Sequence, residues 1–174
     1  MAAIKTHSLA NEQADSARFG AFMNGAYHAD REAFLDGVHR WLMFAVIVLG
    51  ASALTDLLSP HSKMIATGLG ALAGTFDLVF DLSTRARKHG YLRRDYFAQA
   101  AKMAEGSVSP ADAQAAMLML AAEEEPPYYA AMALAENWAN GAVYMDRPAP
   151  RRIGWWSKLT RHLLHRDGES FTTF

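Results

Sequence analysis

The sequence predicts an all-α protein built around a membrane-spanning hairpin of two helices. Two apolar stretches, Trp41 to Leu58 and Met64 to Leu82, are separated only by Ser59 to Lys63. Helices joined by so short a loop lie antiparallel. At about 1.5 Å per residue the first stretch reaches about 27 Å, close to the roughly 30 Å hydrocarbon thickness of a bilayer. The sequence has no strand-like alternation of any length, no internal repeat and no low-complexity tract, so helices are the only elements expected.

Charges inside these stretches leave a soluble helical core open as an alternative. Asp56 interrupts the first stretch, and in the second only Ile65 to Phe76 precedes Asp77, a length that also fits a buried soluble helix. Asp56 falls beside the loop, however, where water can solvate it. Asp77, Asp81 and Arg85 are spaced by four, so a chain of ion pairs on one helical face can neutralise the carboxylates near the interface. Their placement favours the membrane hairpin.

Basic residues flank the predicted hairpin, whereas its loop contains Lys63 alone. They are Lys5, Arg18, Arg31 and Arg40 before the hairpin, and Arg85, Arg87, Lys88, Arg93, Arg94 and Lys102 after it. The positive-inside bias therefore places both termini in the cytoplasm. Directly after a span, the basic run is expected to bind anionic headgroups rather than nucleic acid. Residues 1–18 lack an apolar run followed by a cleavage site, so we expect the first hairpin helix to direct insertion itself.

Helices are also expected on both sides of the hairpin. Apolar residues recur every three to four positions from Asp15 to Arg40, in a helix that should run straight into the first span. A helix over Ser83 to Lys102 should follow the second span until Gly106 breaks it. We therefore divide the chain into an N-terminal cytoplasmic helix (1–40), a transmembrane helical hairpin (41–82), a cytoplasmic helical region (83–146), and a linker with a basic amphipathic helix (147–174).

Two shorter helices are expected in the cytoplasmic region. Ser109 can cap the first, and Asp112 can return a bond to it, as in a capping box. The helix should extend to residue 124, because the residue before a proline avoids the helical conformation and Glu125-Pro126-Pro127 follows. The second helix is expected over Tyr128 to Asn140, ended by Gly141.

The C-terminal segment from Arg151 to Arg166 is predicted to form a basic amphipathic helix. Such a helix can lie in the headgroup layer of a membrane, or its apolar face can pack on the chain's own helices or on those of a neighbour. The residues expected at the membrane surface here are Trp155, Trp156, Lys158 and Arg161.

Small residues recur every fourth position in the second span, at Ala66, Gly70 and Gly74. This spacing makes a groove in which another helix backbone can approach closely, within one chain or between subunits. The letters Gly68-Leu69-Gly70 also begin a dinucleotide-binding fingerprint, but no strand precedes them and no βαβ pattern follows. We therefore interpret the stripe as a packing surface and predict a homo-oligomer.

No pattern in the chain predicts catalysis, a cofactor or a metal site. With no cysteine and a net charge of −1, the chain has no thiolate chemistry and no signature of a nucleic-acid binder. The side formed by His28, Glu32, Asp36 and His39 lacks a recognised metal-ligand spacing. Glu123-Glu124-Glu125 is interpreted as ordinary helix-terminus chemistry. We expect no enzyme.

The organisation from about Ala26 to Lys102 resembles the SLATT-type two-span domains of bacterial conflict systems. The resemblance lies in a long helix leading into two close spans, with Asp77, Asp81, Arg85 and Arg87 leaving the second. It implies a multi-pass, oligomeric protein of the bacterial inner membrane that perturbs or perforates the bilayer in antiviral defence, with a separate trigger protein. The alternatives are a non-perforating helical scaffold, membrane-anchored or soluble, and a holin-like phage membrane protein.

Overall fold

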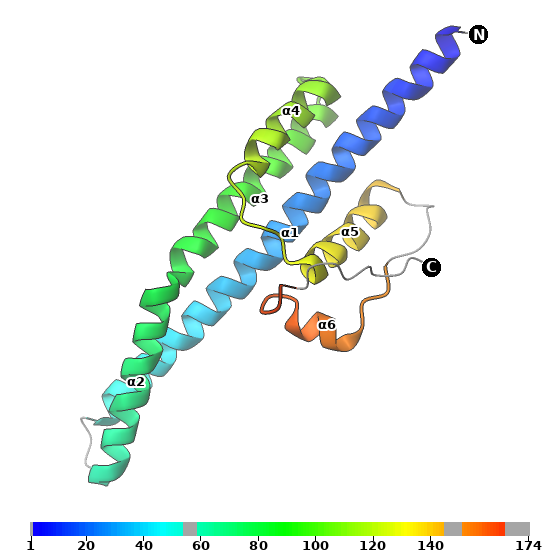
Figure 1. The fold of residues 1–174 in the computed structure, drawn as a ribbon. Coiled ribbons are helices and arrows are strands. Elements are labelled where there is room, and N and C mark those ends of the chain that lie inside the picture. Colours follow the sequence, from blue (N-terminus) through cyan, green and yellow to red (C-terminus); the bar gives the residue numbers. More distant parts are fainter. Residues whose placement is uncertain (1, 54–58, 145–150, 166–174) are drawn as a thin grey trace. The chain divides into compact units, whose positions relative to one another are not determined.

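The computed structural model describes residues 2–53, 59–144 and 151–165 (Figure 1). Within these ranges every regular element is a helix, which confirms the predicted all-α class. In chain order the described helices are α1 (Ala2–Ala53), α2 (Pro60–Phe80), α3 (Leu82–Ala104), α4 (Pro110–Ala121), α5 (Tyr129–Val143) and α6 (Trp155–Thr160).

The chain forms two compact units. The hairpin unit comprises Glu32–Lys88, and the larger unit comprises Met1–Arg31 and His89–Phe174. Helix α1 is unbroken across the boundary at Arg31, as the sequence predicts for a helix that leads directly into the first span. The first proline of the chain is Pro60, so no residue before it removes a helical hydrogen bond.

The hairpin unit contains the second part of α1, all of α2 and the start of α3. Ser59 caps α2 by accepting a hydrogen bond from the backbone nitrogen of Ser62 at 3.2 Å, and Pro60 occupies the first turn. At the other end Asp81 adopts a left-handed conformation, with φ 45° and ψ 50°. The sequence predicted that Asp77, Asp81 and Arg85 share one face of an uninterrupted helix. This prediction is wrong, because the left-handed backbone of Asp81 ends α2.

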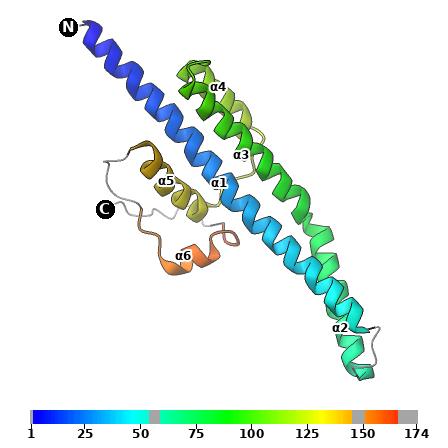
Figure 2. The same cartoon turned by 180° about the vertical axis from the view of Figure 1, so that it is seen from behind.

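The larger unit packs α3 to α6 around the first part of α1. Figure 2 shows α4 alongside α3, and α5 beside α1. One core cluster joins α1, α3 and α4, and a second joins Tyr27 of α1 to Ala131 and Ala135 of α5. The buried members of the first cluster are Ala17, Ala21, Leu92, Tyr96, Ala100 and Met117. Small alanines at these contacts let the helix axes approach closely.

The ends of α4 and α5 follow the prediction only in part. The Ser109 hydroxyl accepts the Asp112 backbone N–H at 3.2 Å and donates to its carboxylate at 2.6 Å, which confirms the cap. The predicted end at residue 124 is three residues too late, because α4 stops at Ala121. Helix α5 continues past Gly141 to Val143, since the Asn140 carbonyl still accepts a bond from the Tyr144 N–H at 2.9 Å.

The C-terminal helix is much shorter than the expected span from Arg151 to Arg166. It covers Trp155–Thr160 only, after four non-helical residues. The side chain of Asn137 holds the backbone of Arg151 by two hydrogen bonds, at 2.6 and 3.0 Å, and thereby keeps this stretch out of a helix.

Candidate functional site

The hairpin unit exposes an unusually large apolar surface. Two helical segments are long and apolar enough to cross a membrane: Glu12–Ser52, which is part of α1, and Pro60–Phe80, which is α2. Only 6% and 11% of their most apolar stretches are buried. A helix of a soluble core would be mostly covered. The large exposed side chains are Trp41, Phe44, Ile47, Val48, Met64, Ile65, Leu69, Leu72, Phe76, Leu78, Val79 and Phe80. Most of this apolar surface of the hairpin unit is therefore exposed in the described part of the chain. Asp56 lies outside the described residues.

The small-residue stripe lies between α2 and α1 of the same chain. Ala66 and Gly70 are buried, and a Cβ on Gly70 would come to 3.4 Å from the Cβ of Leu49. A Cβ on Gly74 would come to 3.7 Å from the side chain of Val46. Of the two uses that the spacing allows, the structure thus shows the one within a chain. A groove of about 570 Å³ remains open along this contact, lined by Val46, Gly50, Thr67, Gly70, Ala71, Gly74, Thr75 and Leu78.

A hydrogen bond between side chains of α1 and α2 lies near the other end of the hairpin. The Nδ1 of His39 on α1 lies 2.8 Å from the Oδ1 of Asp77 on α2. Asp77 thus has a partner on the neighbouring helix, which the sequence did not predict. Arg40 pairs with Asp36 one turn before it, at 2.8 Å. A carboxylate at the margin of an apolar helix needs such a partner or water, and His39 provides one.

The basic residues that follow the hairpin line α3. Arg87, Lys88, Arg93 and Arg94 are exposed, and Arg85 is partly buried. Arg94 lies over the ring of Tyr91 at 5.2 Å, a cation–π contact, and its Nε lies 3.8 Å from a carboxylate oxygen of the exposed Asp95.

A buried polar cluster joins α1, α3 and the segment after α4 in the larger unit. The Nδ1 atoms of His28 and His89 are 2.8 Å apart, so one must donate and the other accept. The Nε2 of His28 lies 3.1 Å from a Glu124 carboxylate oxygen, to which Tyr96 also donates a hydrogen bond. Burial raises the pKa of Tyr96, and Glu124 raises it further. Burial works against the charge of Glu124, but the bonds from His28 and Tyr96 outweigh it and lower the pKa of this carboxyl.

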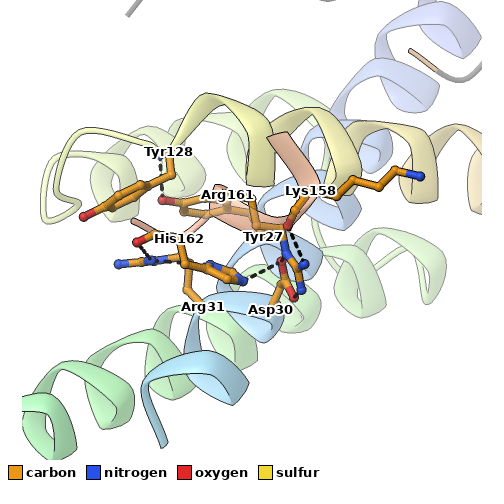
Figure 3. A network of polar contacts seen from close by, with 7 residues as sticks. All are labelled: Tyr27, Asp30, Arg31, Tyr128, Lys158, Arg161 and His162. Atoms are coloured by element: carbon orange, nitrogen blue, oxygen red, sulfur yellow. Dashed lines mark hydrogen bonds and ion pairs between the residues drawn. The ribbon is translucent and has the colours of Figure 1, made fainter. Parts of the chain in front are cut away.

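A second polar network attaches the segment after α6 to α1 (Figure 3). Arg161 makes two bonds to the carboxylate of Asp30, at 2.9 and 3.0 Å, and His162 lies 3.3 Å from the same group. Arg31 donates to the His162 carbonyl at 3.1 Å and lies 4.0 Å over the ring of Tyr128. Burial opposes the charge of Asp30, yet the bonds from His162 and Arg161 hold its pKa well below the usual range. The bonds to Asp30 in turn raise the pKa of Arg161.

A cavity of about 400 Å³ lies beside this network. Its walls are apolar, from Ala26, Phe97, Leu134 and Trp138 among others, and the Asp30–Arg161 pair lies at its edge. The Tyr27 hydroxyl next to it accepts the Tyr128 backbone N–H at 3.1 Å, and burial raises the pKa of Tyr27. This is the size of a small-molecule site, but its polar groups are already paired with one another.

The sequence did not reveal either polar network. Glu124 was interpreted as ordinary terminus chemistry and is instead half-buried, and Arg161 was expected at a membrane surface and is paired with Asp30. Trp155, Trp156 and Lys158 are exposed, as that expectation requires. Glu124 and Arg161 lie too far along the chain from their partners, His28 and Asp30, for residue spacing to predict these contacts. Among the described residues no group of three His, Asp or Glu side chains is arranged to hold a metal ion.

Comparison with protein-family models, with curated proteins and with solved structures found no match to this chain. The functional argument therefore depends on the geometry alone.

Proposed function

We propose that the hairpin unit crosses the bacterial inner membrane with both termini in the cytoplasm, and that hairpins associate to perturb or perforate the bilayer. The observation that carries this proposal is the exposure of the most apolar stretches of two helices. In water such a surface would drive aggregation, whereas acyl chains solvate it without cost.

The length of the apolar hairpin supports an action on the bilayer itself. Between Lys63 and Asp77 the uncharged residues 64–76 extend only about 20 Å, which is about 10 Å less than a typical hydrocarbon core. A span that is too short thins the bilayer around it or draws hairpins together. The mismatch therefore gives both parts of the proposal, local thinning and association, a single physical cause.

The open groove beside Gly70 and Gly74 is the proposed contact between hairpins. Because these glycines already receive α1 of their own chain, a second copy would enter from the exposed side, past Gly50 and Ala71. Gly50 on α1, together with the small residues and threonines on α2, allows close approach of another helix in lipid. The trigger is proposed to be a separate protein, as the resemblance to SLATT-type domains implies.

A matched pair of arginine substitutions tests insertion. Leu72 on α2 and Leu118 on α4 are 67% and 68% exposed, so in water Leu72→Arg and Leu118→Arg would have equally small effects. In a bilayer an arginine near a span centre costs about 2.5–3.5 kcal/mol. We expect the wild type and Leu118→Arg to resist carbonate extraction and Leu72→Arg to be released. Equal behaviour of the two variants would refute the spanning hairpin.

Dye release from liposomes then separates perforation from anchoring. A perforating hairpin releases small dyes in proportion to the bound protein, and Leu72→Arg abolishes the release. A non-perforating, membrane-anchored scaffold is the second candidate, favoured by the separate buried networks and cavity of the larger unit. It would bind the vesicles and resist carbonate without releasing their contents.

A further inference from the structure

Helix α6 and the turn after it present apolar side chains to solvent and polar ones to the protein. Trp155 and Leu163 are 73% and 68% exposed, whereas Ser157 and His162 are buried. Trp156, Leu159 and Leu164 are exposed as well. An amphipathic helix that completes a core has the opposite arrangement, with its apolar side covered.

Ionic and hydrogen bonds hold this segment in place. Arg161 and His162 both contact Asp30 of α1, and Arg31 donates to the backbone carbonyl of His162 (Figure 3). The apolar burial in the segment is small, since Ile153 is its one buried large apolar side chain among residues 151–165. The apolar face is therefore left available for a contact outside the unit.

We propose that this face, formed by Trp155, Trp156, Leu159 and Leu163, docks into the headgroup layer of an anionic bilayer. The two indole rings meet edge to face at 5.2 Å and combine an apolar body with an N–H donor, the combination that enriches tryptophan at membrane interfaces. The inference goes beyond the proposed function and does not require the hairpin to span.

The charge of the segment selects lipid over a second copy of the chain. Residues 151–165 contain no acidic side chain, and Lys158 is exposed on α6 within three positions of both tryptophans. In a symmetric dimer through this face the basic patch of one subunit would meet the same basic patch of the other, with no acidic side chain to pair with it, because a two-fold contact uses the same patch on both subunits. Anionic headgroups instead complement Lys158, at about a fivefold gain in affinity.

Tryptophan fluorescence reports this docking separately from the hairpin. The chain has four tryptophans, so Trp41→Phe/Trp138→Phe leaves only the α6 pair, and Trp155→Phe/Trp156→Phe is the matched complement. Each full-length variant is reconstituted into vesicles whose lipids carry bromine close to the headgroup, with anionic phosphatidylglycerol or without it. We expect bromine to quench the α6 pair strongly in anionic vesicles. The docking equilibrium should weaken about fivefold in zwitterionic vesicles, because the attraction between Lys158 and the anionic headgroups is lost.

Two results would overturn the inference. One is an α6 pair that bromine does not quench in anionic vesicles. The other is α6 fluorescence that is already shielded without lipid, in a dimer detected by sedimentation. If Trp41→Phe/Trp138→Phe fails to fold, loss of the anion-dependent quenching in the complement variant gives the same answer. Carbonate extraction of the same samples reports the hairpin, so failure of the spanning proposal and failure of α6 docking are distinguishable.

Discussion

A designed disulfide tests the packing of α2 against α1 within one hairpin. The chain contains no cysteine, so two introduced thiols can react only with each other or with those of another copy. A Cβ on Gly70 would lie 3.4 Å from the Cβ of Leu49, at the short edge of the roughly 3.5–4.5 Å that a disulfide spans. The variant Leu49→Cys/Gly70→Cys should therefore form an intrachain bridge.

The expected stabilisation follows from the loop that the bridge closes. Linking positions 49 and 70 encloses about 20 residues, for which the chain-entropy relation gives about 3 kcal/mol. The slightly short Cβ separation reduces this value through strain. The matched control is Leu49→Cys/Gly68→Cys, because residue 68 lies about 200° around the helix from residue 70 and a Cβ there meets no atom within 4 Å.

The assay is mild oxidation of each variant in membranes or detergent, followed by alkylation and electrophoresis without reductant. Intrachain closure gives a faster-migrating monomer whose thermal midpoint rises relative to its reduced form, and the control stays reduced. A disulfide-linked dimer at Gly70 would show that the stripe pairs hairpins of different chains. Equal oxidation of both variants would refute the helix orientation on which this reasoning depends.

Three further predictions concern single side chains. Asp30→Asn should cost about 1–2 kcal/mol at neutral pH, a value discounted because Asp30 and Arg161 are each about a third exposed. The pKa of Asp30 is lower in the folded state than in the unfolded state. The wild type should therefore lose this stability as pH falls below about 4, whereas Asp30→Asn should not. The same dependence of the free energy of unfolding on pH for both proteins across pH 2–6 would contradict this. Tyr96→Phe should cost about 1–1.5 kcal/mol in urea unfolding, because Glu124 loses a buried hydrogen bond, and an unchanged midpoint would show that water replaces the hydroxyl. Asp81→Gly should raise the thermal midpoint slightly, and Asp81→Val should lower it because it costs about 1–2 kcal/mol of stability, since Asp81 has a left-handed φ of 45°. The same midpoint for both variants would mean that the helix break has moved.

The helices themselves were predictable because their signals are local. The absence of proline before Pro60, the apolar spacing along α1 and the Ser109 cap each act on neighbouring backbone atoms. The prediction for the C-terminal helix failed where a contact from another helix overrode such a signal. Arg151 and its neighbours have a helix-compatible pattern, but the Asn137 side chain forms hydrogen bonds with the Arg151 backbone, which is not helical.

The sequence by itself determined the all-α class and the two apolar stretches, because helix periodicity and hydropathy are properties of short segments. Only the tertiary structure decided which groups meet. His28 and Glu124 interact although they lie almost a hundred positions apart, and Asp30 and Arg161 are separated by 131. Spacing along the chain carries no information about such pairs, since which helices pack side by side determines the partner of each buried charge. The same packing turned the polar side of α6 inward and left its tryptophans exposed.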